Sequence, residues 1–181
     1  MFRFFVPALG GILMSWGLSG AAQAQATTDQ CPVSKSDWTV CLTNTPKHCW
    51  AASSPKSVVN RRGGQVTQSA SRGTILLLVS FHPGENVKGQ LAFVGGYNFA
   101  PGSTVQLRIG GSSWTLTPGT QGDDREYAWA APGDDAEIVA AMKRGAQAVL
   151  VGTSARPTET TDTFSLIGFT AAYDEAAKRC S

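Results

Sequence analysis

The sequence has few of the residues on which metal-dependent or nucleophilic catalysis depends. It contains two histidines, His48 and His82, and neither belongs to an H-x-x-x-H or H-E-x-x-H pattern. It also has no P-loop and no G-x-G-x-x-G segment, the motifs that hold nucleotide phosphates. We therefore predict that both histidines are surface or strand-end residues, and that the protein has no catalytic set, no metal and no cofactor.

An excess of charge of one sign is also missing. The chain has 15 Lys and Arg against 13 Asp and Glu, a formal net charge of +2. Nucleic-acid binding requires a clustered basic face, so the balance argues against a nucleic-acid partner. No long apolar run occurs beyond the first residues, and we predict no transmembrane segment.

The N-terminal residues have the composition of a secretory signal peptide. A short basic start at Arg3 precedes an apolar run over residues 4–18, and Ala22-Gln23-Ala24 has the small-x-small pattern of a cleavage site. We predict a signal peptide over residues 1–24, with cleavage after residue 26 as the second register. Residues 25–181 would then form one domain in the periplasm, outside the cell or at its surface.

Four cysteines, Cys31, Cys41, Cys49 and Cys180, predict two disulfides in an exported chain, and three pairings are open. No C-x-x-C pattern occurs, so no redox site or zinc knuckle is indicated. Residues 38–41 and 49–52 alternate like two strands of a hairpin, whose facing Cβ atoms lie about 5 Å apart. We therefore predict a Cys41–Cys49 bond, which leaves Cys31 for Cys180.

Short alternating runs fill most of the remaining chain. We predict further strands over residues 74–81, 89–97, 104–109, 112–117, 125–130, 147–153 and 161–167. The polar residues 53–72 predict a long loop, with one irregular edge strand as the alternative. Roughly eight or nine short strands separated by turns are typical of an all-β antiparallel sandwich.

Two segments have helical periodicity. Residues 132–145 carry Asp134 as the expected N-cap, Glu137 as its capping-box partner and Gly145 as the expected C-terminal glycine. The second helix follows Gly168, and its apolar stripe consists of Phe169, Ala172, Tyr173, Ala176 and Cys180. We expect both helices to cap the ends or edges of the sandwich.

Three arginines suggest a contact surface. Arg61, Arg62 and Arg72 lie in the polar segment, where a solvated loop is one interpretation and a contact with an anionic partner or lipid headgroup is the other. Trp114, Tyr127 and Trp129 allow either cross-strand packing or a ligand face.

Paired acids offer the remaining chemistry. Asp123 and Asp124 fall in a predicted loop, where solvation explains them and a glycosidase-type acid pair is the alternative. Asp134 and Asp135 are explained by capping of the first helix.

Several motifs resemble the invasion-associated locus B family of secreted α-proteobacterial proteins. They are Trp38-x-Val40-x-Cys41 with Cys49, Arg61-Arg62, Gly96-Tyr97, Val105-x-Leu107-x-Ile109-Gly110, Ala128-Trp129, Ala141-Met142-x-x-Gly145, Gly152-x-Ser154-x-Arg156 and the segment 161–169. Together they extend over nearly all of the predicted mature chain. Pro157 stands where the family usually has Gly, and its fixed φ predicts a different turn there.

The resemblance implies an immunoglobulin-like β-sandwich, an envelope location and an association with host-cell invasion in some pathogenic members. It implies no known catalytic residue. We therefore predict a non-enzymatic protein that binds a protein or envelope partner. The alternatives are an envelope glycan or cell-wall hydrolase that uses Asp123 and Asp124, and a chaperone-like factor that covers exposed strands of its clients.

Overall fold

The computed structural model describes residues 29–68 and 71–181. The predicted signal peptide and both of its cleavage registers lie outside these residues. The elements are β1 (Gln30–Lys35), β2 (Trp38–Asn44), β3 (Lys47–Ser53), β4 (Ser57–Arg62), β5 (Gln65–Val66), β6 (Leu76–His82), η1 (Pro83–Glu85), β7 (Val87–Val94), β8 (Val105–Ile109), β9 (Ser112–Pro118), η2 (Gly122–Glu126), β10 (Tyr127–Ala130), α1 (Asp135–Arg144), β11 (Gln147–Thr153), β12 (Glu159–Ser165) and α2 (Phe169–Arg179). In this part of the chain no helix is long and apolar enough to cross a membrane.

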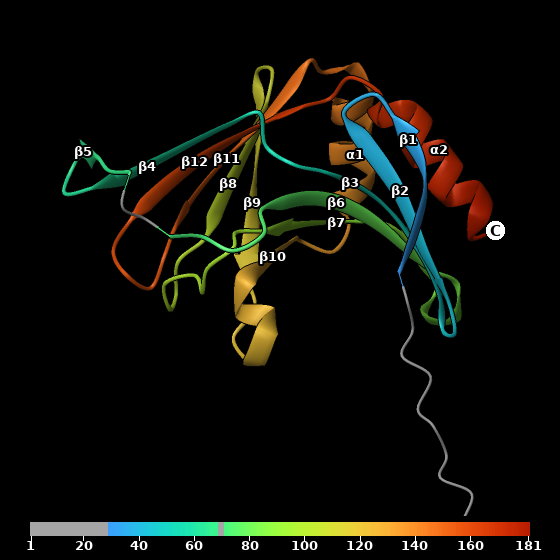
Figure 1. Cartoon of the computed structure of the whole chain (residues 1–181), viewed down its shortest axis with the longest axis horizontal. Helices are drawn as coiled ribbons and strands as arrows, with labels where there is room; N and C mark the ends of the chain where they lie inside the picture. Colours follow the sequence, from blue (N-terminus) through green and yellow to red (C-terminus); the bar gives the residue numbers. More distant parts are fainter. Residues whose placement is uncertain (1–28, 69–70) are drawn as a thin grey trace, which may run out of the picture.

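The described strands form one continuous antiparallel sheet. Its twelve strands run in the order β1-β2-β3-β6-β7-β10-β9-β8-β11-β12-β4-β5. The sheet folds back on itself (Figure 1), so that Phe93 of β7 meets Phe164 of β12 with ring centroids 6.2 Å apart. The indole Nε1 of Trp38 donates to the carbonyl of Ser165 at 3.0 Å across the same interior. The predicted all-β, sandwich-like fold with two helices is confirmed.

Strict alternation builds the core. In β11 and β12 every second residue is buried, and the others face outward or sit at intermediate depth. The largest fully buried side chains come from both halves of the folded sheet and from both helices: Trp38, Phe93, Phe164, Phe169, Leu77, Leu91, Leu107, Leu116, Ile138, Met142 and Leu150. These residues form one hydrophobic cluster.

Helix α1 packs on β7, but its ends differ from the prediction. The backbone N–H of Asp134 donates to Ala131 O at 3.0 Å, and the Asp134 side chain makes no capping bond, so the predicted capping box is wrong. The neighbouring Asp135 instead accepts the Leu91 N–H at 2.8 Å. Gly145 ends the helix with an extended backbone, and its role is close packing, because a Cβ there would lie 2.7 Å from Ile109 Cγ2.

Helix α2 packs on β2 and β3, and its apolar stripe is as predicted. Phe169 is fully buried, and its ring meets that of Trp38 edge-on at 4.9 Å. Gly168 starts the helix with φ +91°, and a Cβ at this position would collide with the carbonyl oxygen of Lys35. The sharp corner between β12 and α2 therefore requires glycine.

The predicted disulfide pairing is wrong. The structure joins Cys31 to Cys41 and Cys49 to Cys180. In the β2–β3 hairpin Cys41 lies opposite Trp50, and Cys49 lies opposite Leu42. Because side chains alternate between the faces of a sheet, Cys41 and Cys49 point to opposite sides.

Each disulfide joins two cysteines that lie on the same side of the sheet. A register shift between Gln30 and Val33 of β1 places Cys31 beside Cys41. Cys49 faces the interior and meets Cys180, the residue that follows α2.

The predicted long loop at residues 53–72 contains two strands. β4 pairs with β12 from Ser57 opposite Thr163 to Arg61 opposite Glu159, and β5 pairs with the end of β4. Both strands lie at the free edge of the sheet, where their side chains are exposed or only half-buried. An edge strand that faces water on both sides needs no apolar alternation, and this explains why its sequence is typical of a loop.

Candidate functional site

A polar pocket with a volume of about 490 Å³ opens at the β4 edge of the sheet. Five separate parts of the chain line it: β4, the segment before β6, the segment after β7, the end of η2, and the β11–β12 turn with the start of β12. The side chains that define it are Asn60, Arg62, Arg72, Tyr97, Arg156 and Thr160. We refer to it as the arginine pocket.

A buried ion pair supports the pocket from below. The Arg72 guanidinium donates from Nη1 to Asp162 Oδ1 and from Nη2 to Asp162 Oδ2, both at 2.7 Å. The Arg72 side chain is 6% exposed and that of Asp162 is 0% exposed. Arg72 also donates twice to the carbonyl of Gly95, at 3.0 and 2.7 Å. Burial raises the pKa of the Asp162 carboxyl, and the charge-assisted bonds from Arg72 oppose that rise.

Tyr97 forms one wall. Its hydroxyl lies 2.6 Å from Thr160 Oγ1, and the Arg72 guanidinium carbon stands 5.0 Å from its ring centroid. Burial raises the pKa of the Tyr97 hydroxyl to about 12. A Cβ at Gly152 would lie 2.9 Å from this hydroxyl, so glycine there leaves room for the ring.

Two exposed arginines form the rim. Arg62 donates from Nε and Nη2 to Thr158 Oγ1 at 3.2 and 3.0 Å. Thr158 Oγ1 donates in turn to the carbonyl of Arg156 at 2.8 Å, and Ser154 Oγ does the same at 3.1 Å. The Arg156 guanidinium makes no hydrogen bond with any described residue, and it remains a free cationic donor at the mouth.

The structure separates the three arginines of the predicted contact. Arg62 and Arg72 both reach the pocket, whereas Arg61 lies on β4 and is not among the lining residues. Arg72 is buried and already paired with Asp162, so it does not belong to a solvated loop. Partner contact by Arg61, Arg62 and Arg72 stays a prediction.

Tyr97, Arg156 and Asp162 are site residues that no catalytic or binding motif in the sequence indicates. Each of them belongs to a motif quoted for the family resemblance: Gly96-Tyr97, Gly152-x-Ser154-x-Arg156 and the segment 161–169. The second and third motifs share the β11–β12 hairpin, and Tyr97 comes to them through its contact with Thr160 of β12.

The other candidates lie elsewhere. Asp123 and Asp124 are exposed in the short turn η2, and neither lines the arginine pocket. Tyr127 and Trp129 stack on one face of β10 with centroids 5.6 Å apart and are half-buried, while Trp114 is buried in the core. Trp114 therefore packs in the core, and Tyr127 and Trp129 pack against each other. A ligand face formed by these aromatic residues stays a prediction.

Residues 62–177 match the family model described as "Invasion associated locus B (IalB) protein". The chain belongs to the IalB family. The matched region begins at Arg62, whereas the motifs that resemble the family begin at Trp38. It contains Arg72, Tyr97, Arg156 and Asp162, and β1 to β3 with three of the cysteines precede it.

The fold of this IalB protein is similar to that of invasion associated protein B from Bartonella henselae, known from a crystal structure. The likeness covers 81% of this chain and 95% of that chain, with a TM-score of 0.55 and 16% sequence identity. At this identity the likeness concerns the fold alone. No curated protein matches the chain.

Proposed function

We propose that this IalB protein is a non-enzymatic binding protein of the cell envelope, exported to the periplasm or the cell surface. Its arginine pocket receives an anionic group, a carboxylate or a phosphate, on a protein or envelope partner. The two disulfides and the family membership support a location outside the cytoplasm.

The observation that carries the proposal is the contrast between the buried and the rim arginines. Asp162 neutralises Arg72, which therefore acts as a support. Arg62 and Arg156 add two charges at the mouth, and Glu126 is the one acid among the lining residues. Guanidinium groups present several N–H donors in a fixed plane, which suits carboxylate and phosphate oxygens.

Hydrolysis by Asp123 and Asp124 is the alternative from another class. A glycosidase needs two carboxyl groups that flank a bound sugar, one of them kept protonated by its surroundings. Both residues are exposed in η2, which lacks such surroundings. A screen on cell-wall and glycan substrates decides between the two functions, and turnover that disappears in Asp123→Asn or Asp124→Asn would establish the hydrolase.

The edges of the sheet argue against a chaperone that binds strands. The outermost strands are β1 and β5. β5 is two residues long, and β1 carries Pro32 and the disulfide-bonded Cys31. Short edges and edge prolines disfavour the addition of another strand. Crosslinking in intact cells should therefore capture a few folded partners rather than many unfolded ones.

The test of the pocket compares two arginine variants of equal charge. A photo-crosslinkable residue at the rim, for example at position 155, should capture an envelope partner, and Arg156→Gln should reduce the yield several-fold. Arg108→Gln is the control, because Arg108 is exposed on β8 and outside the pocket. Equal capture by both variants would exclude the arginine pocket as the binding site.

We also propose that the protein takes part in host-cell invasion. This part of the proposal is tested by comparing host-cell entry of the parent bacterium, a strain without this protein, and a strain that carries Arg156→Gln. Entry that does not differ between the parent and the deletion strain would remove this part and leave the binding function standing.

A further inference from the structure

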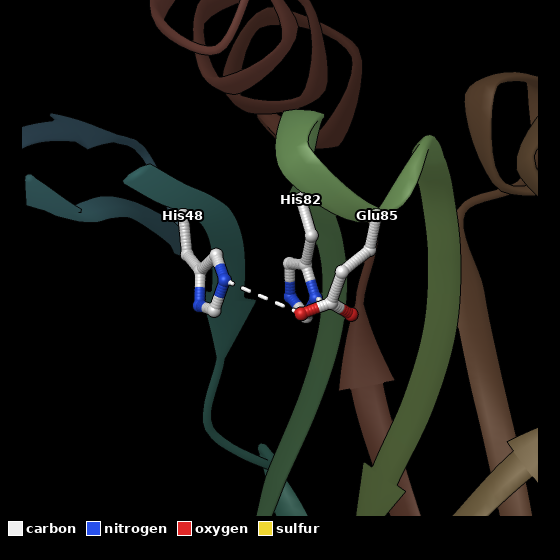
Figure 2. Close-up of side chains that lie close together, drawn as sticks. All are labelled: His48, His82 and Glu85. Carbon is white, nitrogen blue, oxygen red and sulfur yellow. Dashed lines mark ion pairs between the residues drawn. The ribbon is translucent and has the colours of Figure 1, made fainter. Parts of the chain in front are cut away.

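Two histidines and a glutamate gather at one end of β3 and β6. Cys49 pairs with Phe81, and the next position outward on each strand is His48 and His82. Their imidazole rings stack with centroids 4.0 Å apart and an interplanar angle of 18°. Glu85 in η1 places its carboxylate in front of the rings, as Figure 2 shows.

The nitrogen and oxygen atoms of the cluster lie close together. His82 Nδ1 is 3.5 Å from Glu85 Oε2, and His48 Nε2 is 3.9 Å from Glu85 Oε1. One ligand atom from each of the three residues lies within 4.8 Å of the other two. Within residues 29–68 and 71–181 neither imidazole makes a hydrogen bond, so its nitrogens are available to a ligand.

We propose that His48, His82 and Glu85 form a binding site for a divalent first-row transition metal ion, with Zn²⁺ as the reference ion. Neutral imidazole and carboxylate are the ligands that such ions prefer over the all-oxygen sets of Mg²⁺ and Ca²⁺. The remaining coordination positions would face solvent, since the side chains are 28%, 25% and 65% exposed for His48, His82 and Glu85.

Binding of an ion requires the three side chains to move. Ligand atoms bound about 2.0–2.2 Å from zinc lie roughly 3.3 Å apart in a tetrahedron, so the widest separation must close by about 1.5 Å. To bind an ion the Glu85 side chain would rotate and one imidazole would turn out of the stack, because an imidazole nitrogen binds a metal in the plane of its ring. The backbone is held by the β3–β6 pairing, and Pro83 begins the turn that carries Glu85.

The site is separate from the arginine pocket and shares no residue with it. A bound ion would join β3 to β6 and η1, next to the Cys49–Cys180 disulfide. The two proposals can therefore fail independently.

The test uses the mature protein without an oligohistidine tag, stripped of metal with EDTA and dialysed. Zn²⁺ calorimetry should give one ion per chain, and Co²⁺ should give a visible absorption spectrum that Zn²⁺ abolishes. Saturating Zn²⁺ should raise the thermal midpoint by several degrees, because an ion that binds only the folded state stabilises it.

Ligand variants decide the assignment. His48→Gln/His82→Gln and Glu85→Gln should each weaken Zn²⁺ binding at least about tenfold. Glu137→Gln is the matched control, because Glu137 is exposed on α1, away from the cluster, and this variant should bind like the parent.

Two results would overturn the site: no saturable Zn²⁺ binding by the parent, or unchanged affinity in Glu85→Gln. Thermal unfolding in EDTA shows whether each variant is folded. If the histidine variant does not fold, Glu85→Gln still decides, because its exposed side chain contributes little to packing. Stacked histidines with no metal function would give the first result.

Discussion

The guanidinium of Arg72 and the carboxylate of Asp162 share two hydrogen bonds of 2.7 Å. The pair ties the segment before β6 to β12 across 90 positions of sequence. Arg72 also donates to the carbonyl of Gly95. It therefore holds the segment before β6 against the segment after β7.

Removing one partner of this pair should be strongly destabilising. Arg72→Met leaves a buried carboxylate without its cation, and we expect a loss of about 3–5 kcal/mol in the free energy of unfolding. Arg61→Met is the control on the exposed part of β4 and should change the value by less than about 0.5 kcal/mol. Urea unfolding with intact disulfides measures both. A loss below about 1 kcal/mol for Arg72→Met would show that the pair does not support the pocket.

The two disulfides should differ in their effect on stability. Cys49–Cys180 spans 131 positions and Cys31–Cys41 spans 10. The chain-entropy model gives a loss of about 5 kcal/mol on removing the long bridge and about 3 kcal/mol for the short one. Paired Cys→Ser variants with thermal unfolding test the order. Non-reducing peptide mapping checks the pairing itself, and a Cys41–Cys49 peptide would contradict the structure.

The contact between α2 and the sheet should depend on Phe169. Phe169→Ala removes a fully buried ring that packs against Trp38, and the cavity should cost about 3–5 kcal/mol. Ile167→Ala, two positions earlier and 65% exposed, is the control and should cost little. If both variants keep the parent's thermal midpoint, the helix is only loosely attached to the sheet.

Tyr97 should make the folded state sensitive to alkaline pH. Its pKa of about 12 in the folded state exceeds the ordinary value of 10.0, so the unfolded chain loses this proton first as pH rises. The contribution of Tyr97 is therefore complete below pH 10 and is lost as pH rises toward 12. At pH 11 the loss is about 1.4 kcal/mol, relative to pH 8.

The measurement is urea unfolding of the parent and of Tyr97→Phe at both pH values. Other groups titrate in the same range, so the relevant quantity is the difference between the two proteins. We expect Tyr97→Phe to lose less stability than the parent at pH 11. An equal loss would mean that the hydroxyl ionises equally in both states.

Proteolysis should begin in the segment 53–72, at the turn between β4 and β5. Gly63 and Gly64 are exposed there, and both have positive φ, at +56° and +79°. Edge hairpins that pack little side-chain surface open most easily. Limited digestion followed by mass spectrometry identifies the first site. A first cut within α1 would contradict this order of local stability.

Most elements could be predicted from the sequence because their local pattern and their tertiary role agree. β11, β12 and the stripe of α2 alternate or repeat in the way that their burial requires. The sequence of β4 predicts part of a loop, because an edge strand exposed on both faces carries no such pattern. The disulfide pairing depends on the register of the β2–β3 hairpin. A shift of one residue in that register would move Cys49 to the other face of the sheet.

The two candidate sites could not be predicted for a different reason. Each one is assembled from segments that only the strand order brings together. Tyr97 reaches Thr160, and Arg72 reaches Asp162, because the folded sheet brings the segments after β7 and before β6 to β12. His48 and His82 are neighbours because β3 pairs with β6, although 34 positions separate them in sequence.

The Cys49–Cys180 bond closes a covalent ring that contains every element from β3 to α2. A single cut at Gly63-Gly64 would open this ring without dividing the molecule, since both fragments stay joined through the disulfide. The nicked protein should therefore remain one species in the absence of a reductant and retain its fold. Its two pieces would separate only when proteolysis and reduction occur together.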